Sequence, residues 1–152
     1  GLPMTNTGEN PTTNSARWEH FQHGADIGVR GFGPSLASAF EQAALALSAV
    51  LVDPDAINRN ETVEIEVEAP NSDLLLYDWL NAIIYEMGTR DMIFGAYDIS
   101  ISGNKLVGRA HGESVDRERH QPAVEIKGAT MTELATGEIR PGEWRAQCVV
   151  DV

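Results

Sequence analysis

The sequence predicts an α+β protein in which two helices pack on one face of a mainly antiparallel β-sheet. Two segments with helical periodicity lie between residues 35 and 90, and short strand-like segments separated by turn residues follow them. Helices early in the chain and hairpins late are typical of the α+β class rather than of alternating α/β folds. The 152 residues are also the usual length of one domain.

The first predicted elements surround a glycine-rich segment. Aromatic and β-branched residues over residues 18–32 are interspersed with glycines, which predicts one or two short strands with a bend. Ser35 is a candidate N-cap for a helix over residues 36–51, where apolar side chains recur every three or four positions. Pro54 interrupts this period, so a loop is expected to follow.

A second strand and a second helix come next. Residues 61–70 (ETVEIEVEAP) alternate between apolar and acidic side chains, which predicts a strand with one buried and one solvated face. Ser72 is expected to cap a helix whose apolar residues recur at helical spacing as far as Met87. Both helices are therefore expected to face the core.

The rest of the chain is expected to consist of strands and turns. The predicted strands cover residues 92–102, 105–112, 123–131 and 143–152. The predicted separators are a turn at Gly103 and Asn104, a polar loop over residues 113–122, and a turn region over residues 137–142.

The charge balance argues against direct nucleic-acid binding. The chain has 23 acidic and 11 basic residues, a formal net charge of −12. Binding to a phosphate backbone depends on Lys and Arg that release counterions, so no direct contact with RNA or DNA is expected. No membrane-spanning stretch or signal peptide is recognisable, and the only cysteine, Cys148, can form no internal disulfide. A cytoplasmic location is expected, and residues 1–16 are expected to be a disordered polar tail.

Two aspartates at opposite ends of the chain are candidate ligands. Asp26 lies in the segment HGADIGVRGFG, where it could cap a turn or bind a partner group. The last predicted strand ends on Asp151 and Val152, which would add a terminal carboxylate if the chain ends there. If this strand pairs beside the strand that carries Asp26, these oxygens would converge on one site. Such a site suits Ca²⁺ or Mg²⁺ rather than Zn²⁺.

Lys127 is a third candidate, within the apolar segment AVEIKGAT. A lysine in such a segment extends its charge into solvent or pairs with an anion, such as Asp26, Asp151 or a phosphate. The sequence contains no phosphate-binding loop, no nucleophile elbow and no cysteine beside a placed base. Nucleotide hydrolysis and covalent catalysis therefore lack their usual motifs.

Several of these segments resemble the archease family. The matching segments are HGADIGVRGFG, SLASAFEQAALAL, DLLLYDWLNAIIYE, the pair Gly112 and Glu113, EIKGAT and the ending CVVDV. They occur in the order and spacing of the family over about residues 18–152, so residues 17–152 are expected to form a single archease domain. Gly24 and Thr132 depart from the family pattern, which usually has threonine and histidine at these positions.

The resemblance implies an accessory protein rather than an enzyme. Archease is a cofactor protein of the GTP-dependent tRNA-splicing RNA ligase, which joins a 2′,3′-cyclic phosphate or 3′-phosphate to a 5′-hydroxyl. It promotes guanylylation of the active-site histidine of that ligase and so supports multiple turnover, in tRNA splicing or in RNA repair. No catalytic residue is therefore expected in this chain, and its acidic surface would suit a ligase with a basic RNA groove.

The resemblance also implies the functional residues. Asp26 and Asp151 would bind a divalent cation together with a main-chain oxygen of Val152, and Lys127 would serve ligase activation. Calcium is the expected cation, with Mg²⁺ and Mn²⁺ as alternatives. Two other functions stay open: a stand-alone metal-dependent phosphoester hydrolase that uses both aspartates, and a general chaperone-like binding module.

Overall fold

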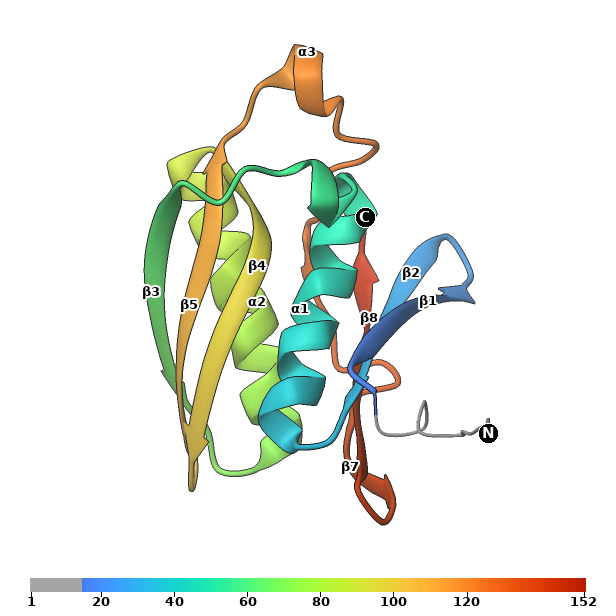
Figure 1. Cartoon of the computed structure of the whole chain (residues 1–152). Coiled ribbons are helices and arrows are strands. Elements are labelled where there is room, and N and C mark those ends of the chain that lie inside the picture. Colours follow the sequence, from blue (N-terminus) through green and yellow to red (C-terminus); the bar gives the residue numbers. More distant parts are fainter. Residues whose placement is uncertain (1–14) are drawn as a thin grey trace, which may run out of the picture.

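The computed structural model describes residues 15–152, which form two antiparallel β-sheets with two long helices between them (Figure 1). The five-stranded sheet has the order β1-β2-β8-β6, and β7 also pairs with β8. Its strands are β1 (Arg17–His23), β2 (Asp26–Gly33), β6 (Gly128–Ala129), β7 (Ala135–Arg140) and β8 (Glu143–Asp151). The three-stranded sheet has the order β3-β5-β4, with β3 (Glu61–Glu68), β4 (Met92–Ser102) and β5 (Lys105–Ser114).

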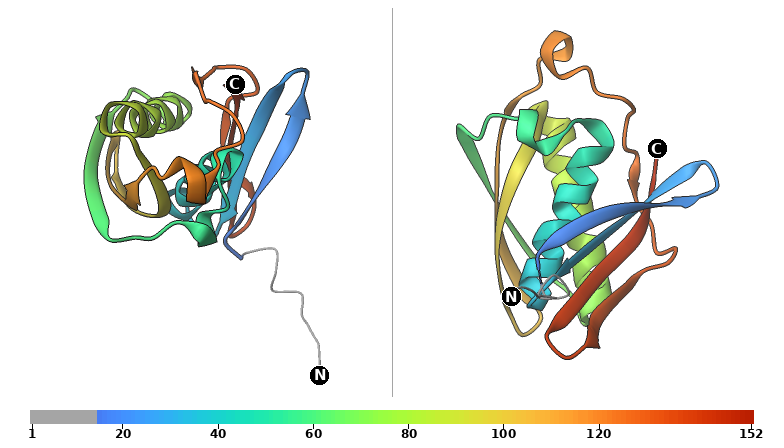
Figure 2. Two further views of the ribbon diagram at one scale, coloured as in Figure 1. Left: turned by 90° about the horizontal axis from the view of Figure 1, so that it is seen from above. Right: turned by 45° about the vertical axis from the view of Figure 1, so that its right-hand side comes forward.

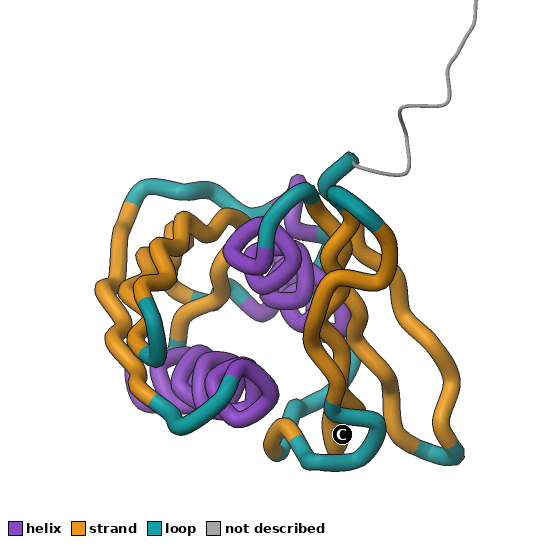
Figure 3. The backbone as a smooth tube through the Cα atoms, turned by 90° about the horizontal axis from the view of Figure 1, so that it is seen from below, coloured by secondary structure: helices purple, strands orange, loops and turns teal. Residues whose placement is uncertain are grey.

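The predicted α+β class is confirmed, and the structure adds that the strands divide into two sheets. The helices α1 (Leu36–Leu51) and α2 (Ser72–Arg90) lie between these sheets, as Figures 2 and 3 show from other directions. The main reason is the breadth of the apolar surface of α1, on which Ala39, Phe40, Ala44, Leu47 and Val50 are all buried. One sheet covers only one side of such a helix, so a second sheet covers the other.

The two helices begin where the sequence predicts, but one cap differs. The Ser35 hydroxyl accepts a hydrogen bond from Ser38 N at 3.1 Å, as expected for an N-cap. In α2 the N-cap is Asn71, whose side-chain oxygen accepts from Leu74 N at 2.9 Å. The expected cap, Ser72, is instead the first helical residue.

Two interactions join the helices to each other and to the three-stranded sheet. Trp79 Nε1 of α2 donates to the carbonyl oxygen of Phe40 in α1 at 3.3 Å. The hydroxyls of Ser48 in α1 and Tyr97 in β4 lie 2.7 Å apart. Because these groups are buried, their mutual hydrogen bonds avoid the cost of leaving polar atoms unpaired in the core.

The segment between the two sheets departs most from the sequence prediction. The expected polar loop over residues 113–122 contains the last residues of β5 and a one-turn helix, α3 (Arg117–His120). Of the strand expected over residues 123–131, only the two residues of β6 form a strand, because the chain before β6 crosses from one sheet to the other. The turn region expected over residues 137–142 includes part of β7, which forms a hairpin with β8.

Residues 1–14 of the expected polar tail lie outside the described residues. Among residues 15–152, no helix combines the length and the apolar character needed to cross a lipid bilayer. The expected wet face of β3 is confirmed, since Glu64, Glu66 and Glu68 are exposed whereas Val63 and Ile65 are buried.

Candidate functional site

Asp26 is the first residue of β2, directly after a tight turn. The turn consists of Gly24 and Ala25, and His23 pairs with Asp26 across it. Gly24 has a φ of +60°, whereas Ala25 has a negative φ. A positive φ at the first turn position alone is the pattern of a type II′ hairpin turn, which favours glycine at that position. Glycine at position 24 therefore suits the turn that positions Asp26.

The pairing of β2 with β8 brings Asp26 towards Asp151. The last paired residues of the two antiparallel strands are Ile27 and Val150, and one further step in the same register places Asp26 opposite Asp151. Ile27 and Val150 pack against the core, so the neighbouring aspartates belong to the outer face of the sheet. Both aspartates are half-buried.

Lys127 lies on the other side of the same strand end. Its main-chain N–H donates to the carbonyl oxygen of Asp151 at 2.8 Å, and the next residue, Gly128, pairs with Asp151 in the β6–β8 ladder. The Lys127 side chain is exposed, and Val152 is half-buried. All four residues singled out in the sequence thus come to one end of the five-stranded sheet, where the C-terminus lies beside the β1–β2 hairpin (Figure 2).

The oxygen atoms at this end suit a hard cation. Within residues 15–152, no group of three or more His, Cys, Asp or Glu side chains is placed to hold a metal ion. A cation here would rely on the carboxylates of Asp26 and Asp151 and on a main-chain oxygen of Val152. Calcium accepts such mixed oxygen ligands at about 2.3 to 2.6 Å and completes its shell with water or a partner's oxygens. The donor set therefore fits Ca²⁺, Mg²⁺ or Mn²⁺ better than zinc.

A stack of side chains on the outer face ties the hairpin to β8. The Phe21 ring of β1 lies over Gly28 of β2, so closely that a Cβ at Gly28 would overlap the ring. The Arg30 guanidinium lies 4.3 Å from the centre of the same ring, and Arg30 Nε donates to the Gln147 side chain of β8 at 2.8 Å. These contacts restrict movement of β2 relative to β8, and so of Asp26 relative to Asp151.

Two hollows of the surface lie near these elements. One, of about 390 Å³, follows the β1–β2 hairpin and includes Asp26 in its lining. The larger, of about 550 Å³, lies between α2 and the segment that precedes β6, away from Asp26. The first hollow would allow a ligand or a partner's side chain to approach the Asp26 carboxylate.

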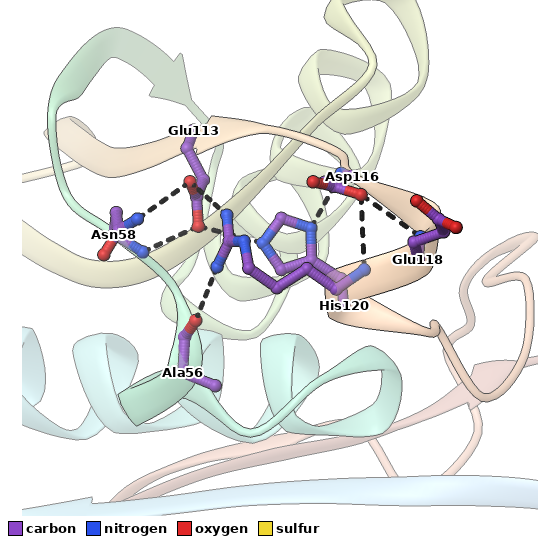
Figure 4. A network of polar contacts seen from close by, with 7 residues as sticks. Ala56, Asn58, Glu113, Asp116, Glu118 and His120 are labelled. Carbon is purple, nitrogen blue, oxygen red and sulfur yellow. Dashed lines mark hydrogen bonds and ion pairs between the residues drawn. The ribbon is translucent and has the colours of Figure 1, made fainter.

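The structure also shows a buried charged residue to which the sequence analysis assigned no role. Glu113, near the end of β5, is only 8% exposed, and both of its carboxylate oxygens accept hydrogen bonds (Figure 4). The Arg119 guanidinium beside it lowers its pKa to about 2. Its partners are Asn58, Arg119 and His120. Because they come from separate segments, no local pattern in the sequence indicates that they meet.

The single cysteine offers no nucleophile. Cys148 is fully buried in β8, and this burial raises the pKa of its thiol to about 12. A thiol with so high a pKa carries almost no thiolate at neutral pH, and the thiolate is the reactive form. This agrees with the lack of covalent-catalysis motifs in the sequence.

The fold and this site define a class of small two-sheet α+β proteins with paired acidic residues at the C-terminal end of one sheet. The chain is similar to the solution structure of protein 1598 of Methanobacterium thermoautotrophicum, with a TM-score of 0.73 and 26% sequence identity. The match covers 89% of this chain and 98% of that one.

The chain belongs to the archease family. The family model described as Archease protein family (MTH1598/TM1083) matches residues 18–152. The proteins named Protein archease of Pyrococcus abyssi and Thermococcus gammatolerans are 37% and 38% identical to it over 140 residues, which covers 90% of this chain and 99% of each relative. This confirms the family identified from the sequence motifs, and it supports a role as an accessory protein in tRNA processing and RNA ligation.

Proposed function

We propose that this protein activates a GTP-dependent tRNA-splicing or RNA-repair ligase in the cytoplasm, by promoting guanylylation of the ligase and multiple turnover. One observation carries the proposal: the β2–β8 register leads Asp26 opposite Asp151, and Lys127 is hydrogen-bonded to the main chain of Asp151. Two carboxylates and a lysine beside one another are the groups needed to bind a cation and an anionic phosphate together.

Each residue has a distinct part in the proposed activation. Asp26 and Asp151 supply carboxylate oxygens for a divalent cation, calcium in the first place, and Val152 adds a main-chain oxygen. The bound cation supplies positive charge that offsets the negative charge of nucleotide phosphates. The exposed ammonium group of Lys127 extends from the same sheet end and donates hydrogen bonds to phosphate oxygens within the active site of the partner.

The overall charge supports a protein partner rather than RNA. A net charge of −12 opposes binding to a phosphate backbone, whereas it favours approach to a basic surface. The RNA groove of a ligase must itself be basic. We therefore expect the ligase to be the direct partner and the RNA to be contacted through the ligase.

The test is RNA ligation by the cognate ligase, with and without this protein, under single-turnover and multiple-turnover conditions. A ligase that is already guanylylated can complete one round alone, so the protein should accelerate only the later rounds. Equal multiple-turnover rates with and without the protein would contradict the proposal. So would hydrolysis of a phosphoester by the purified protein alone, which would favour a metal-dependent hydrolase, or suppression of aggregation of unrelated proteins without any effect on the ligase.

A further inference from the structure

The segment that leads to Lys127 has an anchor far from Lys127, in addition to the main-chain bond of Lys127 itself. This connection, residues 115–127, leaves β5 in the three-stranded sheet, passes over the ends of the helices and reaches β6 in the five-stranded sheet (Figure 1). Near its start, the buried residues Glu113 and His120 and the exposed residues Asn58 and Arg119 form a polar cluster, called here the Glu113 cluster. Figure 4 shows Glu113, Asn58 and His120 of this cluster. Lys127 is the last residue of the connection.

Glu113 accepts four hydrogen bonds within this cluster. One oxygen accepts from Arg119 at 2.6 Å and from the Asn58 side chain at 3.2 Å. The other accepts from the Asn58 main-chain N–H at 2.8 Å and from His120 Nε2 at 2.9 Å. All four partners are donors, so only an ionised carboxylate, which has acceptors alone, satisfies them. The low pKa of Glu113 agrees with this state.

The His120 ring joins the connection to this carboxylate, and both of its nitrogens have hydrogen-bond partners. Its side chain is fully buried, and its Nδ1 accepts a hydrogen bond from Asp116 N at 2.8 Å. Because Nδ1 accepts, the proton of the neutral ring is on Nε2, which donates to Glu113. The α3 turn has only four residues and cannot be stable alone, so this contact holds it against β5.

Between α3 and Ile126 the connection is thinly packed, since none of residues 121–125 is buried. The hollow of about 550 Å³ lies between it and the helices, lined by Ile84 and Met87 on one side and Val124 on the other. Beyond α3 the connection is held at Ala123, whose N–H donates to Leu51 O at 3.1 Å, at Ile126, which is buried in the core, and at the main chain of Lys127. The Glu113 cluster therefore anchors the first half of the connection, whereas Ala123 and Ile126 anchor the half that ends at Lys127.

We propose that the Glu113 cluster is a positioning device that fixes the connection and thereby holds Lys127 beside Asp151. Glu113 and His120 are positioning residues, since they act through Lys127. The inference rests on the proposed function in one respect: the consequence for the ligase requires that Lys127 serve activation. The placement of Lys127 can be measured without any ligase.

Two substitutions of one residue separate the two hydrogen bonds of the His120 ring. In His120→Asn, the amide oxygen can replace Nδ1 and accept from Asp116, but the contact with Glu113 is lost. In His120→Gln, the amide nitrogen can replace Nε2 and donate to Glu113, but the contact with Asp116 is lost. Of the two ring contacts, only the one with Glu113 links the connection to the sheet, because Asp116 belongs to the connection itself. The proposal therefore requires a larger effect for asparagine.

The first measurement is amide hydrogen exchange of the protein alone. Lys127 N is bonded to Asp151 O, so its protection reports whether the connection stays in place. In His120→Asn, protection of Lys127 should fall about tenfold or more while that of core amides such as Val29 stays within about twofold. His120→Gln should keep protection of Lys127 close to the unchanged value. Unchanged protection in His120→Asn, or an equal loss at Val29, would overturn the proposal.

The second measurement is guanylylation of the cognate ligase by GTP, as a function of the concentration of this protein. His120→Asn should lower the maximal stimulated rate about tenfold and leave the half-saturating concentration within about twofold. In a Lys127→Ala background the same substitution should change nothing further. Additive losses would overturn the positioning role. If the unchanged protein does not stimulate the ligase, the proposed function fails, while hydrogen exchange still tests the positioning.

Discussion

The two sheets differ in what lies across from the acidic residues on their outer faces. On the three-stranded sheet, exposed acids lie beside cations on the neighbouring strand: Glu64 is 3.6 Å from Arg109, and Glu66 is 3.6 Å from Lys105. Such cross-strand pairs are ordinary surface electrostatics, worth about 0.2 to 1 kcal/mol each. This face needs no ligand to offset its charge.

At the end of the five-stranded sheet, an acidic residue lies across from another acidic residue. The register of β2 and β8, continued by one residue, places Asp26 opposite Asp151. Within residues 15–152, neither aspartate forms an ion pair at 4.0 Å or less. Like charges placed opposite one another on neighbouring strands destabilise a sheet. The comparison predicts that acidic residues of this protein serve function where their cross-strand neighbour is also acidic, and not where it is a cation.

Cation binding gives the largest difference expected between the two faces. We predict that Asp26→Asn combined with Asp151→Asn weakens Ca²⁺ affinity at least about 100-fold, because two of the carboxylate ligands are lost. The unchanged protein should be stabilised by Ca²⁺ in thermal unfolding, and the double variant should not. Glu64→Gln combined with Glu66→Gln is the matched control and should bind Ca²⁺ normally. Equal stabilisation of both double variants would show that the two faces do not differ.

The stack over Gly28 gives the next largest effect. Gly28→Ala should lower the free energy of unfolding by about 2 kcal/mol, because the new Cβ displaces the Phe21 ring and with it the guanidinium of Arg30. It should also weaken Ca²⁺ binding by moving Asp26 relative to Asp151. Gly88→Ala in α2 is the control, since nothing lies within 4 Å of its Cβ, and it should raise stability by about 0.5 to 1 kcal/mol. Chemical denaturation measures both changes.

The Glu113 cluster predicts a smaller, pH-dependent effect. The folded-state pKa of Glu113, about 2, lies below its ordinary value of 4.5, so the stabilisation from its ionised form is complete above about pH 4.5. It should be lost progressively as the pH falls from there towards 2. Unfolding of Glu113→Gln should lack this component, so the difference in stability between the two proteins should shrink over the same range. A constant difference would contradict the assigned ionisation.

The smallest effect is expected on the three-stranded sheet. Glu64→Gln removes the exposed pair with Arg109 and should lower the free energy of unfolding by less than about 0.5 kcal/mol. Chemical denaturation at low and high salt should show even this difference shrinking with salt. A loss above about 1 kcal/mol would mean that this face is more than a solvated surface.

Much of the fold follows from local sequence signals. The cap at Ser35, the start of the second helix at Ser72 and the alternation from Val63 onward all depend on residues a few positions apart. The division into two sheets does not, because it depends on pairing between strands at opposite ends of the chain. The cap at Asn71 was missed because serine and asparagine are almost equally good N-caps.

The candidate site was predictable only in part. Asp26 and Asp151 stand out as acids in apolar strands, and a single register decides whether they face one another. Glu113 could not be assigned a role, because Asn58 lies in a different loop and the pairing of His120 depends on the connection crossing between the sheets. A hydrogen-bond network assembled from separate segments has no characteristic residue spacing in the sequence, so it could not be predicted.

The central claim is that paired acids at one sheet end, and not acidity in general, activate the ligase. The most direct measurement is the rate of ligase guanylylation by GTP in the presence of Asp26→Asn, Asp151→Asn and the exposed control Glu66→Gln. The account predicts that each aspartate variant loses at least about 90% of the stimulation, since a tenfold loss corresponds to removal of one charged contact, whereas the control keeps it. Equal stimulation by all three variants, each shown to be folded, would contradict it.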